Sequence, residues 1–147
     1  MNLTIYTDGG SLNNPGQAAY GFLIYADKKL LHTQSKRIGI ASNNVAEYTG
    51  LIRALEYVSA LTNPKSQIPK SKQIPKSNIQ SISVFADSLL MVNQVKGLYK
   101  VKNADMKPLH SQVKMLEMEI GRAIKYTHVL RDKNAQADAL VKEALGK

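Results

Sequence analysis

Apolar and polar residues alternate over residues 2–8, and this period of two predicts a β-strand. The strand is expected to end at the turn-forming residues that start with Gly9. Two more strands are predicted, at residues 18–26 and at about 30–38. Because only short turns separate these three segments, they should pair as an antiparallel meander.

The spacing of apolar residues becomes helical after the third strand. One broad apolar stripe predicts a helix from Val45 to about Leu61, which Ser42 can cap and which Asn63-Pro64 ends. The second half of the chain alternates strands with helices. Its strands are expected at 79–86 and 123–130, and its helices at 89–95, 105–120 and 134–145. The order βββαβααβα predicts an α/β fold in which helices pack on a mixed sheet.

A segment of biased composition interrupts this order at about 63–78. It contains Gln-Ile-Pro-Lys-Ser twice, six residues apart, within a stretch rich in proline and lysine. Two units are too few for a repeat fold, so we expect an extended, mobile surface loop. The length favours a single domain over 1–147. A start at Met1 without a linker also favours a free-standing domain over a fragment of a larger enzyme.

The charge balance is strongly basic, with 20 Lys and Arg against 11 Asp and Glu, and a formal net charge of +9. A small domain with this excess is expected to bind a polyanion, and solubility is the simpler alternative. The absence of cysteine excludes disulfides, thiolate metal sites and cysteine nucleophiles. No apolar run reaches the ~18 residues of a membrane span, and no signal peptide is evident, so we expect a cytoplasmic protein that binds no membrane.

Four acidic residues stand at strand ends or helix starts: Asp8, Glu47, Asp87 and Asp138. Each has a simpler explanation, as a turn residue, a partner of the helix dipole, an N-cap or an exposed helix acid. Glu47, however, borders the apolar stripe of its helix, whereas Glu56 lies about 180° around that helix and should be solvated. These four acids are expected to share one edge of the sheet, where their carboxylates would repel one another. A cluster of this kind persists if it binds hard cations such as Mg²⁺, so a cation site is expected there.

The chain resembles the type 1 ribonuclease H family over nearly its whole length. The matching blocks are Tyr6-Thr7-Asp8-Gly9-Gly10-Ser11 with Asn14-Pro15-Gly16, Ser42-Asn43-Asn44-Val45-Ala46-Glu47, Ala86-Asp87-Ser88, Tyr99-Lys100-Val101-Lys102-Asn103 and the run from His128 to Asp138. The resemblance implies a five-stranded mixed sheet, with three antiparallel strands followed by two parallel ones.

The resemblance also implies an endoribonuclease that hydrolyses the RNA strand of RNA–DNA hybrids and leaves 5′-phosphate and 3′-hydroxyl ends. The family uses two divalent ions, so Mg²⁺ is implied here, with Mn²⁺ able to replace it. The residues that match the metal-binding acids are Asp8, Glu47, Asp87 and Asp138. Arg131 matches a histidine that assists product release, but arginine cannot shuttle a proton as histidine does.

Contacts with the hybrid are implied for a further set of residues: Gly9, Asn14, Ser42, Asn43, Asn44, Lys100 and Lys102. The chain lacks the tryptophan-containing basic protrusion of many members, so it resembles their shorter form. The alternatives are a related nuclease that prefers double-stranded RNA or ribonucleotide junctions, a non-catalytic nucleic-acid-binding module, and a detached domain of a reverse transcriptase or integrase-like protein. We expect a monomer that needs no protein partner.

Overall fold

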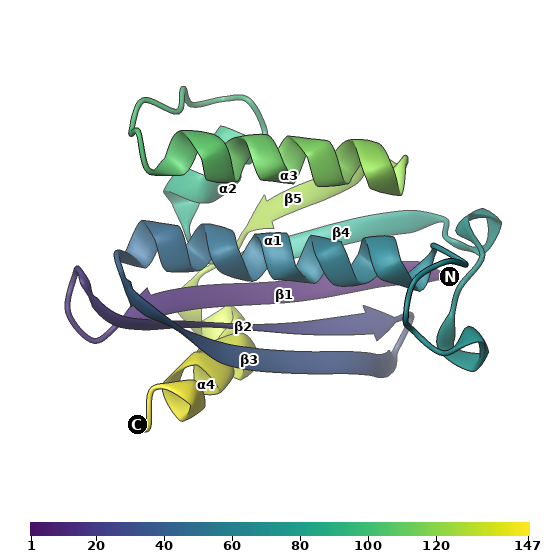
Figure 1. The fold of residues 1–147 in the computed structure, drawn as a ribbon, viewed down its shortest axis with the longest axis horizontal. Coiled ribbons are helices and arrows are strands. Elements are labelled where there is room, and N and C mark those ends of the chain that lie inside the picture. Colours follow the sequence, from purple (N-terminus) through teal and green to yellow (C-terminus); the bar gives the residue numbers. More distant parts are fainter.

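The computed structural model describes all 147 residues, and a single five-stranded sheet runs through the molecule (Figure 1). The strands are β1 (Asn2–Ser11), β2 (Gly16–Ala26), β3 (Lys29–Ala41), β4 (Ser81–Ala86) and β5 (Ile124–His128). They lie in the order β3-β2-β1-β4-β5. The first three pair antiparallel, whereas β4 is parallel to β1 and β5 is parallel to β4. The predicted mixed sheet is confirmed.

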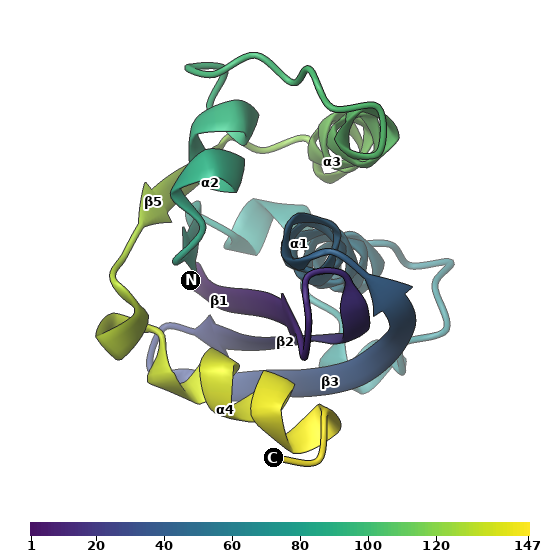
Figure 2. The same cartoon turned by 90° about the vertical axis from the view of Figure 1, so that its left-hand side faces the viewer.

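Helices lie on both faces of this sheet (Figure 2). They are α1 (Asn43–Leu61), α2 (Leu89–Val95), α3 (Met106–Ile120) and α4 (Ala135–Ala144). The first three lie on one face, and α4 lies on the other face against β1, β2 and β3. The predicted order βββαβααβα is therefore confirmed. None of the helices combines the length and the apolar composition that crossing a bilayer requires.

The main core lies between α1 and the sheet. Leu51 and Leu55 of α1 are fully buried there, together with Ile5 of β1. The hydroxyl oxygen of Ser42 accepts a hydrogen bond from a backbone N–H in the first turn at 3.2 Å, so this residue caps α1 as predicted. Glu47 lies one turn before Leu51 on the same face of the helix. Packing of α1 therefore turns the Glu47 side chain toward the sheet.

Strand β1 is longer than predicted. The expected turn residues Gly9 and Gly10 remain in the strand, where they pair with Tyr20 and Ala19 of β2. Asp8 consequently lies within β1 and not at its tip. Pairing with β2, which follows after a short connection, decides this extension, and it overrides the local preference of a Gly-Gly pair for a turn.

The repeated segment at 63–78 is more compact than predicted. Each copy forms a short 3₁₀ turn after its proline, at Lys70–Lys72 and at Lys76–Asn78. Ile74 is 8% exposed and belongs to the main core, and its N–H donates to the Leu61 carbonyl at 2.9 Å. The prediction of an extended loop is wrong because the isoleucine of each unit packs against the core. The segment lies at the end of the molecule opposite to the first turn of α1 (Figure 1).

Candidate functional site

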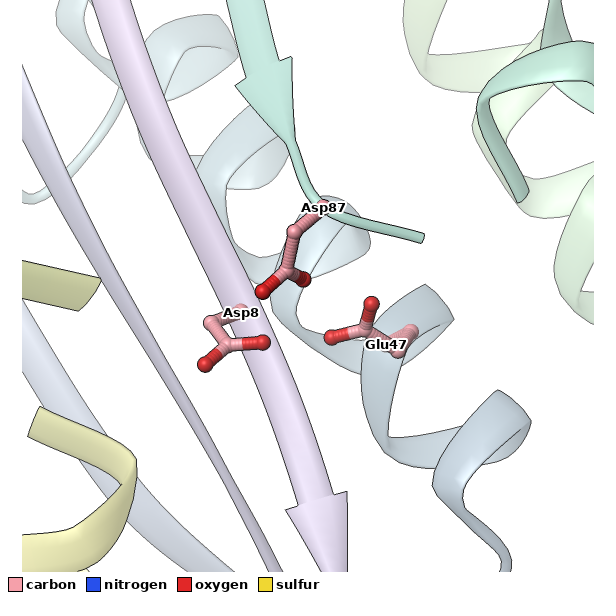
Figure 3. Close-up of side chains that lie close together, drawn as sticks. All are labelled: Asp8, Glu47 and Asp87. Atoms are coloured by element: carbon pink, nitrogen blue, oxygen red, sulfur yellow. The ribbon is translucent and has the colours of Figure 1, made fainter. Parts of the chain in front are cut away.

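Three of the four predicted acids converge at one point of the sheet (Figure 3). Asp8 extends from β1, Glu47 from the start of α1, and Asp87 from the residue that follows β4. Each offers a carboxylate oxygen, and these oxygens lie within 4.8 Å of one another. Segments far apart in the sequence thus form a single acidic cluster.

The register of the parallel strands explains why two of these acids meet. Thr7 of β1 pairs with Ala86 of β4 at the end of their ladder. The next residues along the two strands are Asp8 and Asp87, so their side chains emerge beside each other. Asp87 does not cap α2, because Ser88 is the N-cap residue and its hydroxyl accepts a backbone hydrogen bond at 3.2 Å.

A close approach of α1 to β1 brings in the third acid. The Gly9 N–H donates a hydrogen bond to the Glu47 carboxylate. A Cβ atom at Gly9 would lie 2.3 Å from the carbonyl carbon and oxygen of Ala46, a separation that real side chains do not reach. Glycine at this position therefore lets the helix backbone contact the strand and places Glu47 against Asp8.

The cluster brings three carboxylates together in a buried setting. Asp8 and Glu47 are each 6% exposed. Burial, together with the neighbouring charge of Asp87, raises the pKa of Asp8 to about 7. Burial and the adjacent Asp8 carboxylate raise the pKa of Glu47 well above its usual value. One ion pair reaches the cluster, from Arg131 to Asp87 at 3.8 Å, and the Arg131 side chain is 82% exposed.

This donor set fits a hard divalent cation. Carboxylate oxygens are the ligands that Mg²⁺ and Mn²⁺ prefer, and a bound cation would supply the charge that the surrounding residues do not. An exposed guanidinium at 3.8 Å is a weak substitute, because solvent screens it. The predicted metal chemistry is therefore compatible with the three converging acids.

The fourth predicted acid lies beside this cluster but is not part of it. Asp138 lines the same cavity as Asp8 and Asp87. Its carboxylate forms an ion pair with Lys142 at 2.9 Å, one helical turn further along α4. To bind a metal ion, the Asp138 carboxylate would therefore have to give up its ion pair with Lys142.

The predicted substrate-binding residues separate into two regions. Around the acids, Asn43 and Asn44 line the cavity, and the amide oxygen of Asn14 accepts a hydrogen bond from the Asn43 N–H at 3.0 Å. Lys100 and Lys102 lie elsewhere, exposed on the connection between α2 and α3. The structure therefore brings the asparagines to the acids but leaves the lysines on a neighbouring surface.

Some residues of the cavity were not predicted to belong to it. His128, expected to be structural, lines the cavity at the end of β5, and Ser88, Lys142 and Lys147 also line it. The position of His128 follows from its pairing with Ala86, the residue before Asp87. A predicted register between the fourth and fifth strands could have placed this histidine near the acids.

The pH dependence of stability should report on the buried carboxylates. The unfolded chain ionises Asp8 near its ordinary pKa of 3.8, whereas the folded protein keeps the proton until about pH 7. In the metal-free protein, the free energy of unfolding should therefore fall as the pH rises from about 4 to about 7. At pH above this range, Asp8→Asn should be more stable than the wild type by on the order of 4 kcal/mol, because each unit of the pKa difference corresponds to about 1.4 kcal/mol. Urea denaturation in a chelator across this pH range measures the effect, and parallel pH profiles for the two proteins would contradict it.

The fold and the acidic cluster define an α/β domain suited to holding cations where the ladder between β1 and β4 ends. The comparison with known families gives a more specific result than the fold. The family model described as RNase H matches residues 1–146, so the chain belongs to the RNase H family. Membership confirms the family resemblance that the sequence blocks suggested.

Individual relatives agree with this assignment. The chain is 37% identical over 147 residues to the bifunctional protein Rv2228c of Mycobacterium tuberculosis, a match that covers 99% of this chain and 36% of Rv2228c. It is 33% identical over 142 residues to ribonuclease HI of Halobacterium salinarum, covering 95% of this chain and 62% of that protein. The chain thus spans about a third of the length of the first relative.

A solved structure gives the same result in three dimensions. LC11-RNase H1, isolated from compost by a metagenomic approach, was determined in complex with an RNA/DNA hybrid. Its structure matches this one with a TM-score of 0.84 and 38% sequence identity, over 98% of this chain and 96% of that chain. The similarity extends over the whole sheet and its helices, so the predicted fold class is confirmed.

Proposed function

We propose that the protein is an endoribonuclease that hydrolyses the RNA strand of RNA–DNA hybrids with the help of two Mg²⁺ ions, for which Mn²⁺ can substitute. The observation that carries this proposal is the convergence of the Asp8, Glu47 and Asp87 carboxylates on one point. Membership of the RNase H family supports it, as does the hybrid bound to the similar protein LC11-RNase H1.

The reaction is the attack of water on a phosphodiester of the RNA strand, with cleavage of the bond between phosphorus and the 3′ oxygen. It yields 5′-phosphate and 3′-hydroxyl ends. Bound divalent ions supply Lewis acidity for both the attacking and the leaving oxygen. Asp8, Glu47 and Asp87 would hold these ions, with Asp8 at the centre of the cluster, and Asp138 would complete the set after release from Lys142. Arg131, exposed at the rim, would contact the product phosphate.

Recognition of RNA would come from the asparagines beside the acids. The amide oxygen of Asn43 accepts hydrogen bonds from the N–H and the hydroxyl of Ser11, at 2.8 and 3.1 Å. The amide oxygen of Asn14 is likewise engaged by the Asn43 N–H. Both side chains therefore turn their NH₂ groups outward, where they can donate to the 2′-hydroxyls and base edges of a minor groove. Asn44 and Gly9 line the same cavity as Asn43, and Ser42 would contact a phosphate of the DNA strand.

A panel of labelled duplexes tests this function. The protein should cleave an RNA–DNA hybrid in Mg²⁺ and should leave double-stranded DNA intact, because DNA lacks the 2′-hydroxyl. Faster cleavage of double-stranded RNA, or cleavage restricted to a single ribonucleotide within DNA, would favour the related nucleases. Binding without cleavage, equal with and without divalent metal, would favour a non-catalytic binding module.

The exposed lysines between α2 and α3 should contribute to affinity through phosphate contacts. The double variant Lys100→Ala, Lys102→Ala should weaken hybrid binding by about tenfold and should reduce the slope of log Kd against log salt by about one unit per lost contact. Fluorescence anisotropy of a labelled hybrid at several salt concentrations measures both quantities. Lys28→Ala with Lys29→Ala, at the turn between β2 and β3, is a control with the same loss of charge. An equal effect in both double variants would mean that net charge alone drives binding.

A further inference from the structure

A buried glutamine links α1, the helix that carries Glu47, to the basic connection between α2 and α3, which comprises residues 96–105. Gln94 lies near the end of α2 and is 3% exposed. Its side-chain oxygen accepts a hydrogen bond from the hydroxyl of Tyr48 at 2.6 Å. Tyr48 directly follows Glu47 in α1 and is 1% exposed. This contact therefore joins α2 to the first half of α1 inside the core.

The other end of the same amide reaches the connection. The Gln94 NH₂ group donates to the carbonyl of Lys100 at 3.4 Å. This is the one hydrogen bond that the structure gives to the segment 100–102, where Val101 additionally packs against the core. The backbone carbonyl of Gln94 also accepts from the Gly97 N–H at 3.1 Å and contacts the His110 ring at 3.2 Å. One residue thus ties together α1, α3 and the connection.

The surface that Gln94 supports is suited to a polyanion. A hollow beside the connection is lined by Lys100, Lys107 and Lys114, with Tyr99 and His110, and no acidic residue lines it. The connection projects at the same end of the molecule as the first turn of α1 (Figures 1 and 2). A nucleic acid lying on the acids can therefore extend toward this hollow.

We propose that Gln94 is a positioning residue that sets the affinity for the nucleic-acid substrate by holding the basic connection at a fixed place relative to the helix of Glu47. The identity of the substrate as an RNA–DNA hybrid rests on the proposed function. Gln94 is 3% exposed and does not line the cavity that holds the acids. Its loss should therefore weaken binding and raise KM while it leaves the chemical step unchanged.

The variant Gln94→Met tests this role, because methionine preserves the length and burial of the side chain but makes neither hydrogen bond. We expect KM for a labelled hybrid to rise about fivefold to tenfold, the effect of roughly one lost hydrogen bond, with kcat within about twofold of the wild type. The slope of log Kd against log salt, measured by anisotropy in a chelator, should fall by about one unit as a lysine contact is lost.

Two further variants separate positioning from a loss of stability. Tyr48→Phe removes one of the two links with a smaller change, and it should raise KM in the same direction but less. Gln34→Met is the matched control, because the Gln34 side chain also bonds a tyrosine hydroxyl, that of Tyr20, at 2.7 Å on a distant part of the sheet. It should lower thermal stability while KM and the salt slope stay at wild-type values.

A wild-type KM and salt slope for Gln94→Met would overturn the proposal, even if the variant were less stable. Equal changes in Gln94→Met and Gln34→Met would overturn it as well, because the effect would then follow stability alone. The two hypotheses fail separately. If the wild type binds the hybrid but does not cleave it, the proposed function is wrong, and the salt slopes still decide the role of Gln94.

Discussion

Replacement of Asp8 by Asn should lower the rate of hybrid cleavage by on the order of 10³-fold or more. Asp8 belongs to the acidic cluster, and one of its oxygens lies within 4.8 Å of oxygens from both Glu47 and Asp87. The amide keeps the size of the side chain but removes the negative charge that a divalent ion would neutralise. The initial rate of cleavage of a labelled RNA–DNA hybrid in Mg²⁺ measures the effect. Intact cleavage by this variant would show that the assigned site is wrong.

The control for this experiment lies on α1 itself. Glu56 is exposed and forms an ion pair with Arg53 at 2.8 Å, away from the cluster. Glu56→Gln removes the same charge at a distance from the cluster, so it should leave the cleavage rate unchanged.

Hybrid binding by Asp8→Asn in a chelator should equal or exceed that of the wild type, because the phosphates then meet one negative charge fewer.

The second large effect is expected at Gly9. A methyl group there would lie 2.3 Å from the backbone of Ala46, so Gly9→Ala must separate α1 from β1. We expect a loss of about 3 kcal/mol in the free energy of unfolding, at the upper end of the range for overpacked cores. Cleavage should also fall sharply, because the shift moves Glu47 away from Asp8. Urea denaturation and the hybrid assay measure the two effects.

The neighbouring glycine is a matched control for this prediction. A Cβ atom at Gly10 would meet its nearest neighbours, in Val141 and Asn43, at 3.8 and 3.9 Å, which are ordinary contact distances. Gly10→Ala should therefore change the stability by less than about 0.5 kcal/mol. Equal stability of the two variants would contradict the close approach of α1 to β1.

The fold was predictable where the periodicity of the sequence reflects burial. The stripe that predicted α1 also predicted that Glu47 faces inward and Glu56 faces solvent, and both predictions are confirmed. The extension of β1 through Gly9 was not predictable from local preferences, because it depends on pairing with the residues of β2. The burial of Ile74 was missed because two isoleucines six residues apart, among prolines and lysines, match neither the period of a strand nor that of a helix.

The acidic cluster was predictable as a set of residues but not as a geometry. In the sequence, Asp8 and Asp87 each come after a run of apolar, strand-forming residues, and this local signal led to the correct part of the sheet, although Asp8 lies inside β1. The pairing of Asp138 with Lys142 depends on the side-chain conformations that the two residues adopt on α4, and the sequence does not specify these conformations. His128 was assigned a structural role because its place at the acids requires the register between β4 and β5.

The two 3₁₀ turns of the segment 63–78 have a practical consequence for protein engineering. Each six-residue unit brings its own isoleucine and its own turn, and the segment connects the end of α1 to β4. Closing a longer loop adds little entropic penalty, since the penalty grows only with the logarithm of length. This end of the molecule is therefore a permissive position for the insertion of a reporter peptide, opposite to the first turn of α1 that carries Glu47.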